Sequence, residues 1–165
     1  MIDKSGSRTY LRAMTRRSAT LIVVVAAVCL LWGLVGQSCA GAVRDANAGR
    51  EGQPIDLTSL PVKGKTTIVD CYSIYCPPCM RIGPLLEQLA QKRSDLAIKK
   101  VDIQRPEKTG GIDWKSPLAQ QLGLRAIPHF MIFNANGKLE SQGQQATKQV
   151  VDWLQEAGLI GKGTR

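Results

Sequence analysis

Short runs of β-branched and apolar residues recur along the chain from residue 55 onward, and they predict a series of strands. The clearest run, Thr66–Tyr72 (TTIVDCY), is apolar almost throughout, which is typical of a strand buried on both faces. Asn136-Gly137 lies between two later runs and predicts a hairpin turn. The predicted strands are residues 55–57 (a short strand or hairpin), Thr66–Tyr72, Leu96–Ile103, His129–Phe133 and Lys138–Gln142.

Apolar residues at helical spacing lie between these strands. Ile82, Leu86 and Leu89 share one face of a helix predicted over residues 76–92, and Pro84 is expected to kink that helix. The other predicted helices are residues 116–122, with Ser116 as the cap, and residues 147–158; the polar segment Gln104–Lys115 is predicted to be a long loop. Strands that alternate with helices and end in a hairpin predict an α/β fold with a mixed sheet.

The N-terminal segment has the pattern of an export signal. A basic stretch ending in Arg16-Arg17 precedes an uncharged apolar run over residues 21–36, and small residues that include Ala40 and Ala42 follow. This order is typical of a secretory signal peptide cleaved after Ala42. An uncleaved anchor stays open as the alternative, with residues 19–37 as a membrane tether, because the run is only slightly shorter than a membrane span.

Both interpretations place the rest of the chain outside the cytoplasm, because basic residues before the apolar run hold the N-terminus inside. We therefore expect a periplasmic or otherwise extracytoplasmic protein, either secreted or anchored. The predicted divisions are residues 1–42 as signal peptide or anchor, residues 43–53 as a polar linker and residues 54–160 as one folded domain.

The positive charge of the chain does not indicate nucleic-acid binding. The 165 residues carry a formal net charge of +9, but five of the 22 Lys and Arg residues precede residue 43. The remaining excess is spread along the chain without a block, whereas a nucleic-acid site needs a clustered basic patch or a known motif.

The sequence Cys76-Pro77-Pro78-Cys79 follows a buried strand and opens a helix. Helix N-terminal amides stabilise a thiolate, so the first cysteine is expected to have a lowered thiol pKa. Two cysteines one turn apart can form and break a disulfide, which indicates a redox-active pair. A structural zinc site is a weak alternative because it needs about four ligands, and a static disulfide would gain little from closing so short a loop. No metal and no cofactor are predicted.

These residues resemble the active-site segment of thioredoxin-fold proteins. The resemblance is carried by Val69–Pro84 (VDCYSIYCPPCMRIGP) and by Ala126-Ile127-Pro128, and it extends from about residue 54 to 159. The segment over residues 55–67 (IDLTSLPVKGKTT) is similar to the extracytoplasmic TlpA/ResA-like branch. The resemblance implies a three-layer α/β/α fold with a central mixed sheet, and a thiol–disulfide oxidoreductase.

By position, the resemblance implies that Cys76 is the exposed nucleophile and Cys79 the buried resolving thiol. Asp70 occupies the position of the family's buried acid. An acid in this strand is costly to bury, so its pKa is expected to rise, and it can then accept a proton from Cys79. A solvated aspartate at the strand end is the alternative.

The resemblance also implies a substrate-binding surface beside the cysteines. Pro128 matches a cis-proline that keeps the site open, and the backbone of Ile127 is expected to pair with an extended substrate by strand addition. Tyr75 stands where well-known members have a tryptophan, and we expect it to supply aromatic packing near the site and to contact substrate.

Three residues allow more than one interpretation. Cys71 points away from Asp70 by strand alternation and is expected to be a small buried hydrophobe, with a third redox cysteine as the alternative. Trp114 in the long loop either covers the sheet edge or grips a partner. His129 follows Pro128 directly and either packs near the site or contributes to catalysis or metal binding.

The direction of exchange is predicted from Pro78. Proline lacks an N–H, so the Cys76 thiolate loses one potential donor, which favours a dithiol reductant. The resemblance implies clients such as apocytochrome c or other disulfide-containing proteins, and a membrane carrier of electrons or disulfides as the partner. An oxidising disulfide donor stays open as an alternative. So does a Cu(I)-handling module that uses Cys76 and Cys79, with Cys71 or His129 as a further ligand.

Overall fold

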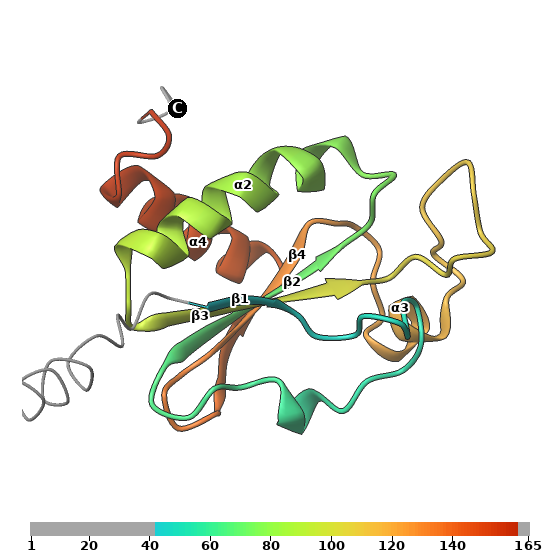
Figure 1. Ribbon diagram of the computed structural model, residues 1–165, viewed down its shortest axis with the longest axis horizontal. Helices are drawn as coiled ribbons and strands as arrows, with labels where there is room; N and C mark the ends of the chain where they lie inside the picture. Colours follow the sequence, from blue (N-terminus) through green and yellow to red (C-terminus); the bar gives the residue numbers. More distant parts are fainter. Residues whose placement is uncertain (1–41, 162–165) are drawn as a thin grey trace, which may run out of the picture. The chain divides into compact units, whose positions relative to one another are not determined.

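One mixed sheet of five strands forms the centre of the computed structural model, which describes residues 42–161 (Figure 1). The strands lie in the order β1-β3-β2-β4-β5. β1, β3 and β2 are parallel, whereas β4 runs antiparallel to both β2 and β5. The strand bounds are β1 Ala42–Asp45, β2 Thr66–Tyr72, β3 Leu96–Asp102, β4 His129–Phe133 and β5 Leu139–Gln142.

Helices cover both faces of this sheet, as the predicted three-layer arrangement requires. α2 (Pro77–Lys92) and α4 (Gln144–Glu156) lie on one face, and α3 (Pro117–Gln121) lies on the other together with the 3-10 helix η1 (Leu57–Ser59) (Figure 1). Each face has its own buried core. On the α2/α4 face this core includes Ile68, Leu86, Leu89, Phe130, Val150 and Leu154, and on the α3 face it includes Val69, Cys71, Val101, Leu118 and Met131.

β2 is the strand that positions the site. It is paired on both sides, by β3 in parallel and by β4 in antiparallel register, and five of its seven residues are buried. Because a strand alternates its side chains, Asp70 shares the face of Ile68 under α2, whereas Cys71 packs in the core on the opposite face. The strand then leads directly into the turn that begins α2.

Several predicted elements are confirmed with their bounds or nearly so. β2 and β4 have the predicted limits, and α2 contains Pro84 in its interior. The predicted cap of α3 is also present, since the Ser116 hydroxyl accepts a hydrogen bond from the amide of Ala119 at 3.1 Å. α4 begins at Gln144, three residues before the predicted start, directly after Gly143 with its left-handed φ of 64°.

Two predictions for the segment before β2 are wrong in their secondary structure. Residues 43–53 were predicted to be a linker, but the structure places Ala42–Asp45 as an edge strand beside β3. Asn47 then fixes the following turn, because its side chain bonds both the carbonyl and the amide of Asp102 at 2.7 and 3.0 Å. An edge strand this short is stabilised by its partner strand more than by its own sequence, so the local pattern does not reveal it.

The short strand predicted at residues 55–57 is a 3-10 helix over Leu57–Ser59 instead. The carboxylate of Asp56 accepts hydrogen bonds from the amide and the hydroxyl of Thr58 at 2.9 and 2.7 Å. This local side-chain bonding competes with strand pairing and starts a turn.

The predicted signal peptide or anchor and the possible tether over residues 19–37 lie outside the described residues. Within residues 42–161, no helix has the length and apolar character needed to cross a membrane.

Candidate active site

The first turn of α2 holds a disulfide between Cys76 and Cys79. Cys76 is the N-cap residue, and its sulfur accepts a hydrogen bond from the amide of Cys79 at 3.2 Å. The two residues between them are prolines, which carry no N–H. The Cys79 amide is therefore the one backbone donor within the first turn that bonds this sulfur.

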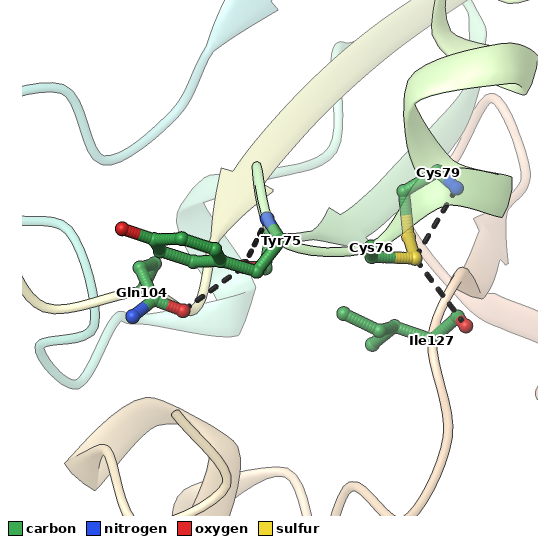
Figure 2. Close-up of a disulfide and its surroundings, with 6 residues drawn as sticks. Tyr75, Cys76, Cys79, Gln104 and Ile127 are labelled. Carbon is green, nitrogen blue, oxygen red and sulfur yellow. Dashed lines mark hydrogen bonds between the residues drawn. A yellow bond between two sulfur atoms is a disulfide. The ribbon is translucent and has the colours of Figure 1, made fainter. Parts of the chain in front are cut away.

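Both cysteines are buried. Cys76 is 2% exposed and Cys79 is 3% exposed, so the prediction of an exposed nucleophile at Cys76 is wrong for the oxidised state. The reason is the loop before β4, because the carbonyl oxygen of Ile127 lies 3.7 Å from the Cys76 sulfur. Figure 2 shows the sulfur between the Cys79 amide and this carbonyl.

The Ile127–Pro128 peptide bond is cis, as the resemblance implied. The loop that contains it faces the disulfide through the Ile127 carbonyl (Figure 2). The structure thus brings together four of the predicted site residues, Cys76, Cys79, Ile127 and Pro128, from two segments about 50 residues apart in the chain.

Asp70 is fully buried, and neither of its carboxylate oxygens has a hydrogen-bond partner. Burial raises the pKa of Asp70 to about 7, because the charged form loses its hydration and gains no donor. The nearby charge of Lys100 opposes this rise and only partly offsets it. The alternative of a solvated strand-end aspartate is therefore wrong, and a carboxyl that titrates near neutral pH can take up or release a proton there.

Lys100 is the basic residue next to Asp70 in the sheet, since the two are partners in the parallel register of β2 and β3. Its ammonium group lies 4.8 Å from the ring centroid of Tyr72, at the end of β2. The aromatic face stabilises the cation in a partly buried position. Sequence analysis did not single out Lys100. Lysine is rarely buried, so two consecutive lysines in an otherwise apolar strand were a signal that could have identified it.

Tyr75 precedes the disulfide, but its ring extends away from the two sulfurs (Figure 2). Its backbone amide bonds the hydroxyl of Ser73 at 3.1 Å. The large apolar side chains that are exposed near the disulfide are those of Ile74 and Met80, at 58% and 51%. These two residues are near the cysteines in the chain, and sequence analysis did not select them.

The remaining candidates make no contact with the disulfide that the structure records. Cys71 is fully buried and reduced, and burial raises the pKa of its thiol far above the ordinary value. Burial lowers the pKa of His129, so this ring is neutral near pH 7. Trp114 is 39% exposed in the loop before α3. Across residues 42–161 no three His, Cys, Asp or Glu side chains gather as a metal site.

Two further polar residues adjoin the site and were missed. Ser73 and Gln104 hydrogen-bond each other at 2.9 Å, and both are buried. They are 31 residues apart in the chain, and a serine or a glutamine alone carries no sequence signal for such a pairing.

Comparison with known proteins agrees with this geometry. The family model described as Thioredoxin matches residues 58–156. A thioredoxin-like protein of Fusarium culmorum is 36% identical over 84 residues, which cover 49% of this chain and 62% of the relative. The chloroplastic F-type thioredoxin of Pisum sativum is 35% identical over 72 residues, 44% of this chain and 35% of the relative. Thioredoxin-1 of Schizosaccharomyces pombe is 29% identical over 85 residues, 52% of this chain and 74% of the relative.

The chain thus spans from about a third to about three quarters of the length of these relatives. Among solved structures, thioredoxin f from spinach chloroplast superimposes with a TM-score of 0.48 at 22% identity, covering 73% of this chain and 97% of that one. The family match extends over more than half of the 165 residues and includes the disulfide and the cis-proline loop. The chain belongs to the thioredoxin family.

Proposed function

We propose that this protein is a thiol–disulfide oxidoreductase that reduces disulfides of other proteins outside the cytoplasm. The observation that carries the proposal is a disulfide at the N-terminus of α2, facing a cis-proline loop, above a sheet that holds a buried acid with a near-neutral pKa. Thioredoxins, the family to which the chain belongs, are thiol–disulfide oxidoreductases.

The exchange proceeds in two steps that move two electrons from the protein to its substrate. The Cys76 thiolate attacks one sulfur of a substrate disulfide, which forms a mixed disulfide and releases the first substrate thiolate. The Cys79 thiol then gives up its proton, for which Asp70 is the proposed acceptor, and attacks the Cys76 sulfur. The substrate leaves with both thiols reduced, and the Cys76–Cys79 disulfide remains.

The direction of exchange is proposed from the small number of groups that can stabilise a thiolate at Cys76. A strongly oxidising disulfide needs a strongly stabilised thiolate in the reduced form. Here Pro77 and Pro78 offer no amide, and the Cys79 amide is the backbone donor that bonds the sulfur. His129 adds no positive charge near neutral pH, because burial lowers its pKa. These features favour a reductant.

Substrates are proposed to bind as extended segments across the Ile127 loop. Strand addition to the Ile127 backbone would place a substrate disulfide over Cys76, which lies 3.7 Å from that carbonyl. Ile74 and Met80, exposed and close to the cysteines in the chain, are proposed to provide apolar contact to the substrate. A partly unfolded client that exposes apolar residues beside its disulfide fits this surface, and apocytochrome c belongs to this class.

The compartment is proposed from the sequence of residues 1–42, with its basic stretch, apolar run and small residues. A reductant outside the cytoplasm must itself be reduced after each turnover. We propose a membrane carrier of thiol electrons as that donor, in keeping with the similarity of residues 55–67 to the TlpA/ResA-like branch.

A trapping experiment tests substrate exchange. The Cys79→Ser variant keeps the attacking thiol of Cys76 and cannot complete the second step, so it should accumulate mixed disulfides with client proteins. The control is Cys76→Ser, which keeps Cys79 and should trap far less. Equal trapping by both variants would contradict the assignment of Cys76 as the nucleophile.

The compartment is tested on the full chain by adding a protease to cells whose outer layer has been removed and whose inner membrane is intact. The folded domain should be digested, whereas a cytoplasmic control protein should stay intact. Full protection of the domain would contradict the extracytoplasmic part of the proposal and leave the chemistry in place.

A further inference from the structure

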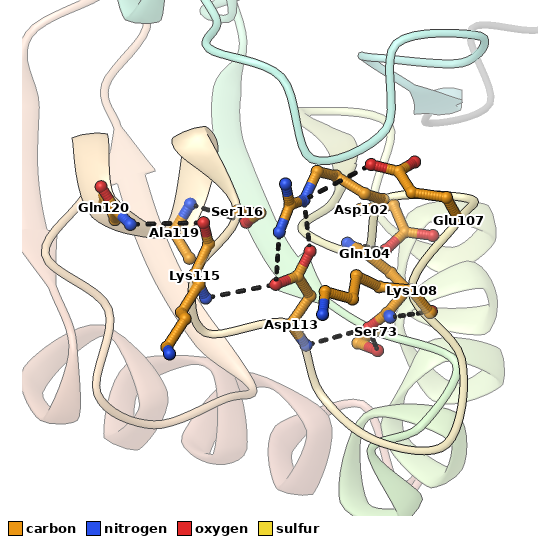
Figure 3. A network of polar contacts seen from close by, with 11 residues as sticks. Ser73, Asp102, Gln104, Glu107, Lys108, Asp113, Lys115, Ser116, Ala119 and Gln120 are labelled. Atoms are coloured by element: carbon orange, nitrogen blue, oxygen red, sulfur yellow. Dashed lines mark hydrogen bonds and ion pairs between the residues drawn. The ribbon is translucent and has the colours of Figure 1, made fainter.

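A buried hydrogen-bond network joins the loop over residues 104–116 to the turn that carries Cys76. Its central residue is Gln104, which is 5% exposed. The side-chain oxygen of Gln104 accepts from the hydroxyl of Ser73 at 2.9 Å and from the amide of Asp113 at 3.1 Å, while its side-chain nitrogen donates to the carbonyl of Lys108 (Figure 3). The Gln104 side chain is thus bonded on both its oxygen and its nitrogen.

Ser73 connects Gln104 to the turn that carries Cys76. Its hydroxyl donates to Gln104 and accepts from the amide of Tyr75 at 3.1 Å, and its carbonyl accepts from the amide of Cys76 at 3.0 Å. Two consecutive amides at the end of the turn are therefore held by one residue that is itself fully buried. The position of the Cys76 backbone depends on where Ser73 is held.

The far end of the network is an ion pair within the loop. Asp113 is 5% exposed, and its carboxylate accepts from the guanidinium of Arg105 at 2.6 and 3.1 Å and from the amide of Lys115 at 3.2 Å. Arg105 bonds only the carboxylate of Asp113, whereas the backbone amide of Asp113 donates to Gln104. The ion pair stabilises the loop but touches neither Ser73 nor the cysteines in this network.

We infer that Ser73 and Gln104 are positioning residues for the Cys76 thiolate. The sulfur receives one backbone hydrogen bond, from the Cys79 amide, so thiolate stabilisation depends on how Cys76 is oriented toward that single donor. In a helix whose first turn has several free amides, a sulfur at the N-cap that loses one amide donor after a small rotation can bond another. Here the two residues after Cys76 are prolines, so no second amide can replace the lost one. This inference rests on the thiol–disulfide exchange proposed above, and not on its direction or compartment.

The test measures the reactivity of Cys76 in the reduced full chain. Ser73→Ala and Gln104→Leu remove the two sides of the 2.9 Å hydrogen bond, and Arg105→Gln is the matched control that loosens the loop without removing that bond. Cys76 alkylation by iodoacetamide is followed across pH by mass spectrometry of its peptide, which gives its apparent thiol pKa. The free energy of unfolding of each variant is measured in parallel with urea.

We expect Ser73→Ala and Gln104→Leu each to raise the thiol pKa and to slow alkylation at pH 7 by about threefold or more, because the thiolate fraction falls. The double variant should match the more affected single variant, since both act through one hydrogen bond. Arg105→Gln should lose stability while the thiol pKa stays at the wild-type value.

Two results would overturn the inference. One is that Ser73→Ala and Gln104→Leu lower stability but leave the alkylation profile of Cys76 unchanged, which would make the network purely structural. The other is that Arg105→Gln shifts the profile as much as they do. If Gln104→Leu fails to fold, the smaller change Ser73→Ala decides the question alone. Alkylation needs no protein substrate, so its outcome is separate from the trapping of mixed disulfides by Cys79→Ser, which tests the proposed function.

Discussion

Replacing Asp70 with asparagine should remove a buried carboxyl group that lowers the free energy of unfolding by an amount that depends on pH. The side chain is fully buried with both oxygens unpartnered, and burial raises its pKa from 3.8 to about 7. Below about pH 4 the carboxyl is protonated in both the folded and the unfolded chain, so it costs little. Between about pH 4 and 7 the unfolded chain loses this proton while the folded chain keeps it, and stability falls.

The size of the effect follows from the two pKa values. At about 1.4 kcal/mol per pH unit, the difference between 3.8 and about 7 corresponds to about 4 kcal/mol of destabilisation above pH 7. Asparagine has nearly the same shape and no charge at any of these pH values. The Asp70→Asn variant should therefore match the wild type in stability near pH 4 and exceed it by up to about 4 kcal/mol above pH 7.

The assay is urea unfolding of the oxidised protein at pH values from 4 to 9. Asp152→Asn, at a half-exposed position on α4, is the control and should follow the wild-type curve. Parallel stability curves for the wild type and Asp70→Asn over the whole range would refute the reasoning, because they would mean that Asp70 is not held in the folded state with a raised pKa. The same variant should also release mixed disulfides more slowly if Asp70 accepts the proton of Cys79.

Three further predictions concern residues around the site and in the core. Cys71 should resist alkylation in the folded reduced protein and react only after unfolding, because its thiol is fully buried with a raised pKa; rapid labelling of its peptide in mass spectrometry would contradict this. Gly52→Ala should lower the free energy of unfolding by about 1–3 kcal/mol, since φ is 71° and the added Cβ would lie 2.6 Å from the Arg105 side chain; an unchanged urea midpoint would count against the strain. Leu89→Ala should cost about 2–5 kcal/mol in the same assay through the cavity it leaves under α2, and a loss below 1 kcal/mol, roughly, would mean that the core refills.

Sequence analysis predicted the parts of the fold whose local signals agree with their surroundings. The bounds of β2 were predicted correctly from the apolar run TTIVDCY. A strand buried on both faces is apolar along its whole length, so the run begins and ends where the strand does. Ser116 followed by Pro117 marked the start of α3 because cap and first-turn chemistry are local. The predicted kink at Pro84 stays a prediction, although its place inside α2 is confirmed.

What sequence analysis missed depends on contacts between distant segments. Ala42–Asp45 is a strand because β3 offers a free edge, and four residues carry too little pattern to reveal it. The Ile127 carbonyl that lies against the buried Cys76 sulfur is 51 residues away in the chain, and the exposed thiol that the resemblance implied is wrong for the oxidised state. Gln104 was assigned to a polar loop, which was correct for its backbone, but its side chain is buried against Ser73. The roles assigned to Asp70, Tyr75 and the cysteines stay predictions until the variants are measured.

The reduction potential of the Cys76–Cys79 pair tests the central claim most directly. It is measured by equilibrating the protein in glutathione or dithiothreitol buffers and quantifying the disulfide at each ratio. The account predicts a value near that of thioredoxin, about −270 mV, because a single amide donor stabilises the Cys76 thiolate. A value near about −120 mV would contradict it and make the protein a disulfide donor. The absence of any reversible couple, with stoichiometric Cu(I) binding by the reduced pair, would contradict it in favour of metal handling.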